Sequence, residues 1–502
     1  MQLPEPCAEI EHIDHEIARL QARQLVLSTY VAAHKALISP IRQLPVDLVR
    51  EIFVACIPTD SNAVMSAKEA PLLLGRICSS WRTIALSTPR LWSSIHIAVP
   101  HDKLPHHVHD GCLELVKEWL ARSGGLPLSI SFHRYPPPGS SPFFDAIVSF
   151  SSRWKHISVL GQQIRLSRAN VPMLQSIEIL DYAGGDESAE TPDFLSGDAV
   201  RSVCLGTDLN PTQLPLPWNQ LTVLSLDRLR SSHQPFPDPW SLTSSTALRI
   251  LTQCQNLREC AISLSSGTDG TVEVSSSESV ELPFLSSLSI FVAARRAFSP
   301  QHHDTLDRLR LPQLSSFSLS GPGFNHDSPG GFPFPTLIST ATQLKRVEID
   351  SLLLFTKEAL ITFMQLLPPS VQFLALRQCV AGTSVPAIAD SDFLRSLIPP
   401  PSDETQPGAG AGLLLSQLDT LELHYSASFS DDELLRFVRA RMDHHPLRRV
   451  HVKFYREAES DILPELRSFV GLDVSLEYNN MRPRNVWNPR DGLRGRYGAS
   501  YR

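Results

Sequence analysis

One short pattern, apolar-x-x-apolar-x-apolar, recurs along most of the chain and constrains its fold more than any other feature. The copies begin at Trp154, Leu174, Val200, Leu221, Leu257, Leu285, Leu314, Leu344, Val371, Leu418 and Leu447. The last two apolar residues of each copy are two positions apart, which is the period of a strand with one buried face. Forty prolines are scattered between short apolar runs and indicate frequent turns. The sequence therefore predicts many short strands rather than one ordinary core, which a chain of 502 residues would also exceed.

Helices are predicted between some of these strands. Residues 356–367 and 430–442 are the clearest examples. Ser430 followed three residues later by Glu433 has the sequence of a capping box, which marks a helix start. Interspersed helices and long spacing argue against a β-sandwich, the alternative for a chain of short strands.

The N-terminus carries a heptad pattern. Apolar steps of three and four residues define the seam of a helix that ends near Pro40, and the seam comprises Ile10, Ile13, Ile17, Leu20, Gln24, Leu27 and Val31. Two interpretations are open: a short coiled coil that dimerises the protein, or an amphipathic helix folded back on its own domain. We expect the second, and a monomer, because an isolated coil this short is marginally stable.

A compact helical segment is predicted between residues 41 and 99. Pro45 suits the first position of a helix and Asp47 suits its first turn. The apolar residues that follow cover more than half of the helix circumference, wider than a stripe of roughly 100°; they are Leu48, Val49, Ile52, Phe53, Cys56 and Ile57. A helix that is apolar on two sides needs two partners, and the second is typically another protein.

An ordered set of residues in this segment resembles the F-box motif, in its fungal F-box-like variant. The set is Leu44, Pro45, Leu48, Ile52, Phe53, Ile77, Cys78, Trp81, Arg82, Ile84, Leu91 and Trp92. The resemblance implies binding to the adaptor subunit of a cullin–RING ubiquitin ligase through Leu44, Pro45, Leu48, Ile52 and Phe53. Its core would be Ile77, Trp81, Ile84 and Trp92. The alternative is a small helical domain packed on the rest of the protein.

The recurring strands resemble the irregular leucine-rich repeats that follow many F-boxes. Most copies stand about 20 to 36 residues apart, which overlaps and exceeds the usual repeat period. The expected fold class is α+β to α/β, with an N-terminal helical F-box-like block followed by an irregular leucine-rich-repeat-like solenoid. The expected parts are an N-terminal helix (1–38), the F-box-like domain (39–98), a connector (99–150), the repeats (151–478, with a flexible insertion at 399–412) and a basic disordered tail (479–502).

Strand alternation places polar side chains on the face opposite the apolar ones. In the middle strands these side chains are serines, namely Ser287, Ser289, Ser316, Ser318 and Ser320. In the later strands they are long and charged, and we expect target binding by Arg346, Glu348, Arg377, Glu422, Arg449 and Lys453. Serines let an extended peptide approach, and the cations would pair with its acidic or phosphorylated side chains. The alternative is an ordinary solvent-facing sheet surface.

The composition argues against several classes of protein. The net charge is −7, so no overall basic field suggests nucleic acid as the main partner. No apolar run approaches the length of about 18 residues that a membrane span needs, and the acidic first thirty residues are atypical of a signal or transit peptide. Eight cysteines without a C-x-x-C pair indicate reduced thiols, and hence a cytoplasmic or nuclear location.

No catalytic residue, cofactor or metal site is predicted. The stretch "PGAGAG" lacks the Lys-Ser/Thr of a phosphate-binding loop, and no Gly-x-Ser-x-Gly elbow occurs. A histidine-rich stretch could bind zinc through His101, His106, His107, His109 and Asp110, but no second half-site follows. We prefer a solvated loop there.

These patterns favour a non-enzymatic substrate-recognition subunit of an SCF-type ligase. Its expected partners are the adaptor subunit, the cullin and an unknown target protein. One alternative is an interaction protein of repeats that never meets a ligase. Another is an RNA-binding protein that uses the arginines and aromatic residues of the tail, although a disordered tail is the preferred interpretation.

Overall fold

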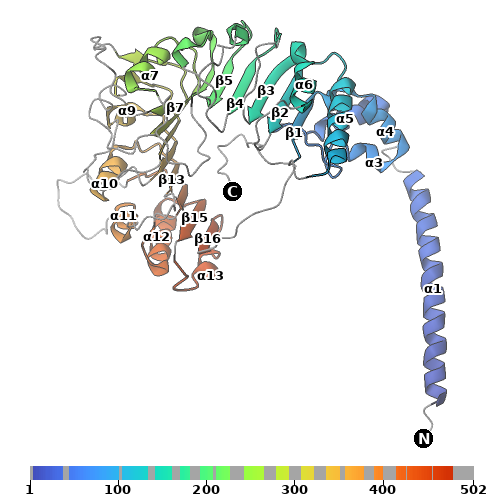
Figure 1. Cartoon of the computed structure of the whole chain (residues 1–502). Coiled ribbons are helices and arrows are strands. Elements are labelled where there is room, and N and C mark those ends of the chain that lie inside the picture. The colour runs from blue at the N-terminus through green and yellow to red at the C-terminus, as the bar shows by residue number, and fades with distance from the viewer. Residues whose placement is uncertain are drawn as a thin grey trace. The chain divides into compact units, whose positions relative to one another are not determined.

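The structure is a computed structural model of the chain (Figure 1). It describes residues 4–37, 44–100, 104–133, 142–160, 170–180, 193–206, 211–226, 242–264, 279–292, 307–321, 335–350, 357–377, 389–398, 414–424, 427–454 and 456–478. The predicted insertion at 399–412 and the predicted tail at 479–502 lie outside these ranges. The chain divides into two compact units. Unit 1 is Met1–Ile95 with Glu118–Leu126, and unit 2 is His96–Lys117 with Pro127–Arg502.

Unit 1 is built from helices around an aromatic core. Its elements are α1 (Pro4–Leu37), α2 (Val46–Ala55), α3 (Leu74–Ile77), α4 (Ser79–Leu86), the 3-10 turn η2 (Pro89–Trp92) and the end of α5 (His106–Arg122). Trp92 is buried, meets the ring of Trp119 edge to face at 4.9 Å and donates its indole N–H to the carbonyl of Ala85 at 2.9 Å. Trp92 therefore lies in the core of unit 1.

In the described part of the chain, fourteen strands form one parallel sheet. In spatial order they are β1 (Ser94–Ala98), β2 (Leu128–His133), β3 (Trp154–Leu160), β4 (Ser176–Leu180), β5 (Ser202–Gly206), β6 (Val223–Leu226), β7 (Glu259–Leu264), β9 (Ser287–Val292), β11 (Ser316–Ser320), β12 (Arg346–Asp350), β13 (Phe373–Arg377), β14 (Thr420–His424), β15 (Arg449–Phe454) and β16 (Asp473–Tyr478). Two further short strands, β8 (Val280–Glu281) and β10 (Leu309–Arg310), pair with each other. The order of these fourteen strands in the sheet follows their order in the chain, and β8 and β10, which lie between them in sequence, are not part of it.

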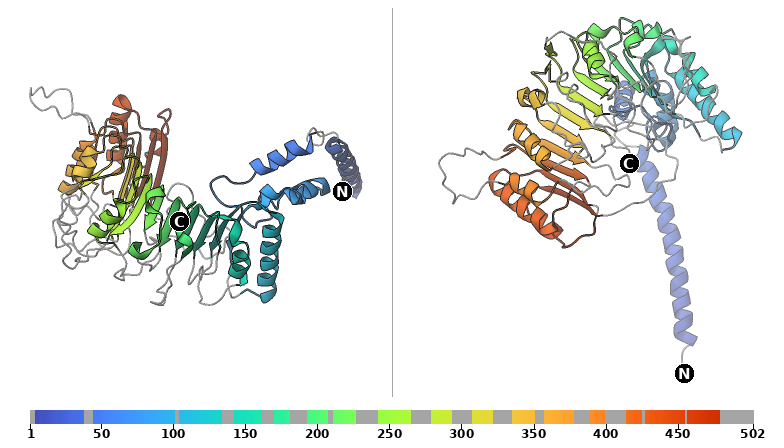
Figure 2. Two further views of the ribbon diagram at one scale, coloured as in Figure 1. Left: turned by 90° about the horizontal axis from the view of Figure 1, so that it is seen from above. Right: turned by 60° about the vertical axis from the view of Figure 1, so that its left-hand side comes forward.

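The helices of unit 2 cover one face of this sheet. They are α6 (Pro142–Val148), α7 (Ser244–Leu251), α9 (Pro335–Thr340), α10 (Lys357–Leu366), α11 (Ser391–Ser396), α12 (Asp431–His444) and α13 (Leu463–Leu466). The 3-10 turns are η3 (Ser151–Arg153), η4 (Asp193–Ser196), η5 (Pro211–Gln213) and η6 (Trp218–Gln220). The sheet of unit 2 curves, and α7, α9, α10 and α11 follow its outer side (Figures 1 and 2). The core lies between the helices and the sheet, and it is formed by the apolar side chains of both.

The local predictions for the strands and helices are confirmed. In β12 the burial alternates, with Val347 and Ile349 inside, and Leu344 is buried in the turn that precedes the strand. The predicted helices correspond to α10 and α12. Ser430 and Glu433 form the predicted capping box, in which each side chain accepts a hydrogen bond from the other residue's backbone N–H.

The predicted fold class is wrong. The described residues form an α/β structure around one 14-stranded parallel sheet, not a helical F-box-like block followed by a solenoid of repeats. The helical segment continues directly into the sheet, because β1 begins two residues after η2 ends. The strands pair edge to edge in one sheet although their connections differ in length and content. The stretch predicted as a connector holds α5, β2 and α6.

The predicted packing of the N-terminal seam is also wrong. We expected the seam to fold back on its own domain, but its large apolar residues on α1 are exposed, from Ile17 at 46% to Ile10 at 58%. The helix is thus formed without burying its apolar stripe. In the described ranges, no helix is both long and apolar enough to cross a membrane.

A buried arginine fixes the C-terminal part of unit 2. The guanidinium of Arg441, on α12, donates to the carbonyls of Leu397 at 3.2 Å and Leu415 at 2.8 Å. One side chain therefore links α12 to both segments that carry these carbonyls, residues 389–398 and 414–424. Burial lowers the pKa of Arg441 to about 10, which leaves it charged at neutral pH.

Replacing Arg441 with Met should lower the free energy of unfolding by about 2–4 kcal/mol, because two buried carbonyls lose their charged donor. Urea denaturation measures this difference. The control is Arg436→Met, an exposed position on the same helix, where a change within about 0.5 kcal/mol is expected. Equal losses in the two variants would contradict the role given to Arg441.

Candidate functional site

Helix α2 has two apolar sides with different surroundings. Phe53 is fully buried, and its ring lies 4.8 Å from that of Trp81. On the other side Leu48 is 53% exposed and Ile52 42% exposed. Leu44 lies before the start of the helix, four residues from Leu48, and is also exposed. We call Leu44, Leu48 and Ile52 the α2 apolar face: Leu48 and Ile52 lie one above the other on the helix, and Leu44 directly precedes its N-cap residue Pro45.

An ion pair holds α2 beside η2. Glu51 of α2 accepts a hydrogen bond from Arg90 of η2 at 2.6 Å. Both side chains are more than half exposed, so the pair contributes little to stability. On the same helix Phe53 is directed toward the core, and the α2 apolar face is left in solvent.

Two of the residues predicted in this segment have the opposite environment. Phe53 was predicted to contact the adaptor, but it is part of the core, because Trp81 fills the space beside it. Ile77 was predicted in the core, but it is 54% exposed at the end of the one-turn helix α3, where Cys78 turns to an extended backbone. Trp81 and Ile84 are half-buried, and Pro45 is exposed at the N-cap of α2.

In unit 2, the polar face of β12 to β16 carries a connected row of charged side chains. Arg377 contacts Glu348 at 2.7 Å and Glu422 at 3.9 Å, and Arg346 contacts Glu348 at 2.6 Å. In the sheet register Ala375 stands between Glu348 and Glu422. The small side chain of Ala375 leaves room for the guanidinium of Arg377 to reach both carboxylates.

The row continues through two histidines on β14 and β15. The rings of His424 and His451 are 5.0 Å apart, and Glu477 of β16 lies 3.4 Å from His451 and 3.1 Å from Lys453. Burial, followed by the positive charges of His451, Arg377 and Lys453, lowers the pKa of His424 to about 4, although Glu477 opposes this. His424 is therefore neutral at physiological pH. We call this set the charged row: Arg346, Glu348, Arg377, Glu422, His424, His451, Lys453 and Glu477.

The cations predicted to bind an acidic target already have carboxylate partners. Arg449 contacts Asp473 at 3.0 Å, and Lys453 and Arg377 contact the glutamates described above. Asp473 and Glu477 lie on β16, a strand that the recurring pattern did not reveal. The alternation of Val474, Leu476 and Tyr478 is the signal that could have located it. An acidic ligand would have to displace an internal carboxylate from each cation.

The serines that we expected to let a peptide approach are in register with small residues of the neighbouring strands. Ser289 is in register with Ser318 on one side and with Ala261 on the other, and Ala261 is in register with Ser225. Small side chains therefore form a continuous row beside the charged row. At the far end of this small row, Glu178 accepts a hydrogen bond from Ser158 at 2.6 Å.

The histidine-rich stretch is helical rather than a solvated loop. His106, His107, His109 and Asp110 lie in the first turns of α5, whereas His101 lies outside the described residues. Within the described ranges, no group of three or more His, Cys, Asp or Glu side chains is placed to hold a metal ion.

No family model matches the chain, and no curated protein matches it.

The contribution of Arg377, which pairs with both Glu348 and Glu422, can be measured as a change in the free energy of unfolding. Arg377→Met should lower the free energy of unfolding by about 1–2 kcal/mol, because it leaves two half-buried carboxylates facing each other. Arg449→Met is the matched control, since its single partner is exposed, and should change stability by less than about 0.5 kcal/mol. If denaturant titrations showed an equal loss in the free energy of unfolding for Arg449→Met, the prediction that the paired carboxylates depend on Arg377 would be wrong.

His424 should make stability fall as the solution is acidified. Its pKa is about 4 in the folded chain and about 6.5 when unfolded, so protons bind the unfolded chain more tightly. This contribution is fully present above pH 6.5 and is lost progressively between pH 6.5 and pH 4. The difference in melting temperature between wild type and His424→Gln should therefore change across this window and stay constant from pH 7 to pH 8. A constant difference at every pH would contradict the low pKa.

Proposed function

We propose that this protein is a non-enzymatic substrate-recognition subunit of an SCF-type cullin–RING ubiquitin ligase. The α2 apolar face binds the adaptor subunit, through which the cullin is recruited, and the polar face of the sheet binds a target protein. A cytoplasmic or nuclear location goes with this function.

The observation that carries the proposal is the exposure of Leu44, Leu48 and Ile52. These are positions at which the F-box resemblance implies adaptor contact, and they are apolar side chains that unit 1 does not bury. Exposed apolar side chains that share one helix face are typical of a protein interface. Phe53 contributes indirectly, because its packing on Trp81 sets the direction in which the face points.

For the target, the polar face offers chemistry of both signs. The small row lets a backbone approach the sheet, and the charged row beside it presents cations already paired with carboxylates. Such a surface fits a partner that brings both acidic and basic groups, because each can exchange with an internal one. It fits a purely acidic peptide less well. The proposed RNA-binding alternative rests on residues 479–502, outside the described ranges.

The adaptor contact is tested with Leu44→Ala/Ile52→Ala. Truncating two central anchors should weaken binding to purified adaptor by about 2 kcal/mol or more, roughly thirtyfold, measured by titration calorimetry. Leu86→Ala is the control, since Leu86 is an equally exposed apolar residue on α4, outside the α2 apolar face. It should bind like the wild type.

Two outcomes would contradict the proposal. One is wild-type affinity of the double variant, provided that its circular dichroism shows a folded chain. The other is an affinity purification of the wild-type protein in which mass spectrometry finds neither adaptor nor cullin. The second outcome would favour an interaction protein that works outside the ligase.

A further inference from the structure

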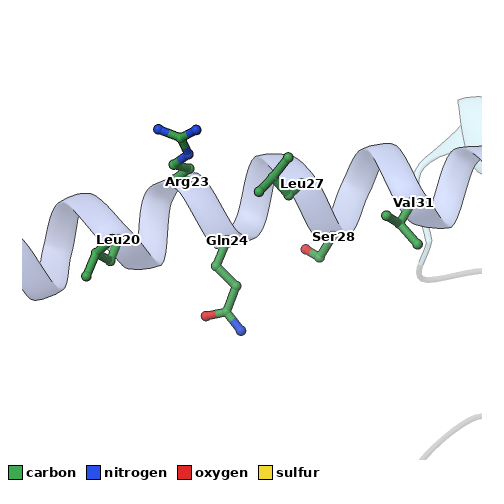
Figure 3. A pocket seen from close by; sticks show the side chains of 6 residues that line it. All are labelled: Leu20, Arg23, Gln24, Leu27, Ser28 and Val31. Atoms are coloured by element: carbon green, nitrogen blue, oxygen red, sulfur yellow. The ribbon is translucent and has the colours of Figure 1, made fainter.

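The seam of α1 is a continuous apolar stripe without a partner in the structure. Six large side chains along it are exposed by 46% to 58%; they are Ile10, Ile13, Ile17, Leu20, Leu27 and Val31. Figure 3 shows the C-terminal part of this helix with the side chains of Leu20, Arg23, Gln24, Leu27, Ser28 and Val31, all of which come from α1 itself. A surface of this kind is costly in water, so it indicates an occupant.

The residue types along the seam select the occupant. Counting from Ile10 as position a of a heptad, the a positions are Ile10, Ile17, Gln24 and Val31, and the following d positions are Ile13, Leu20 and Leu27. β-Branched residues at a with leucine at d favour two parallel strands, and one polar residue at an a position fixes their register. Apart from isoleucine at d in the first heptad, the seam follows this rule.

A second copy of the chain satisfies every layer of such a pair. When two copies lie parallel and in register, each layer meets itself, so Gln24 faces Gln24 and its amide finds a hydrogen-bond partner. Three complete heptads separate Ile10 from Val31, on a helix that is about 51 Å long at 1.5 Å per residue. The seam carries no charge from Ile10 to Val31.

The flanking positions allow this arrangement. In a parallel pair, Glu16 stands opposite Gln21 of the second copy, and Arg23 stands opposite Ser28, so neither charge meets a like charge. Glu16 is also paired with Arg19 of its own helix at 2.6 Å. Like charges meet at the N-terminal end, where Glu9 stands opposite Asp14. The centre of the pair is thus free of repulsion.

We propose that α1 is the dimerisation element of this protein and pairs with α1 of a second copy as a parallel, in-register two-stranded coiled coil. The pairing replaces the monomer expected from sequence, and it goes beyond the proposed ligase function because the adaptor would bind α2. A dimer brings two target-binding sheets into one complex, so a target with two binding segments would be held by avidity.

The full chain should sediment with about twice its mass of 55.7 kDa at low micromolar concentration. Ile13→Asp/Ile17→Asp should abolish the dimer. The matched control is Leu25→Asp/Val26→Asp, which places the same charges at two apolar residues that are 68% exposed on the same helix but outside the seam. This control should remain dimeric. A monomeric wild type, a larger assembly, or loss of the dimer in the control would each overturn the proposal.

Cross-linking tests the register independently of any loss of helix in the charged variants. Parallel pairing brings the two Cα atoms of residue 24 to about 6 Å, a separation that a disulfide spans. With oxidised glutathione, Gln24→Cys should give a larger fraction of covalent dimer than the wild type. The wild type gives the background that is due to the native cysteines. Leu25→Cys should not exceed that background. An antiparallel pair, or another protein as occupant, would leave Gln24→Cys at the background level and overturn the assignment.

Discussion

The backbone hydrogen bonds that join the start of each strand to the start of the preceding one fix most other features of unit 2. The amide of Asp419 donates to Gln372, that of Gln372 to Lys345, and that of Lys345 to Ser315, at 2.8 to 2.9 Å. The same step recurs from Ser315 to Ser286 and from Arg448 to Asp419. Because equivalent residues pair each time, the register is constant from β9 to β16, and a shift of one residue would exchange the two faces of a strand.

Constant register explains why the polar face is organised into rows. A side chain on one strand contacts the side chain at the equivalent position of the next strand. The residues that form a row are therefore neighbours across strands and are far apart in the sequence. Glu348 and Glu422 would repel each other across Ala375 without Arg377, and Lys453 would be an isolated half-buried cation without Glu477. The charged row is therefore a structural feature as well as a candidate binding surface, and substitutions in it test both roles at once.

Sequence patterns predicted the features that depend on neighbouring residues. The strand positions, the helix at 430–442 with its capping box and the two-sided character of α2 follow from spacings of two to four residues, which the chain satisfies locally. Features that depend on pairing at a distance were missed. The single sheet requires strands that stand 20 to 47 residues apart to align, as the printed copies of the pattern show. The carboxylate partners of Arg449 and Lys453 lie on β16, whose short alternation was not recognised.

The exposed apolar residues of unit 1 illustrate a second limit of sequence reasoning. Phe53 and Ile52 are adjacent and both apolar, yet one is fully buried and the other is 42% exposed. Periodicity identifies both as parts of an apolar helix surface, but their environments differ because Trp81 reaches only one of them. The same reasoning applies to α1, where a regular seam predicts a partner without saying whether the partner is the same chain. An apolar side chain therefore becomes part of the core only where the chain itself provides apolar surface that packs against it. In unit 1 the aromatic core supplies that surface, whereas the seam of α1 and the α2 apolar face remain exposed.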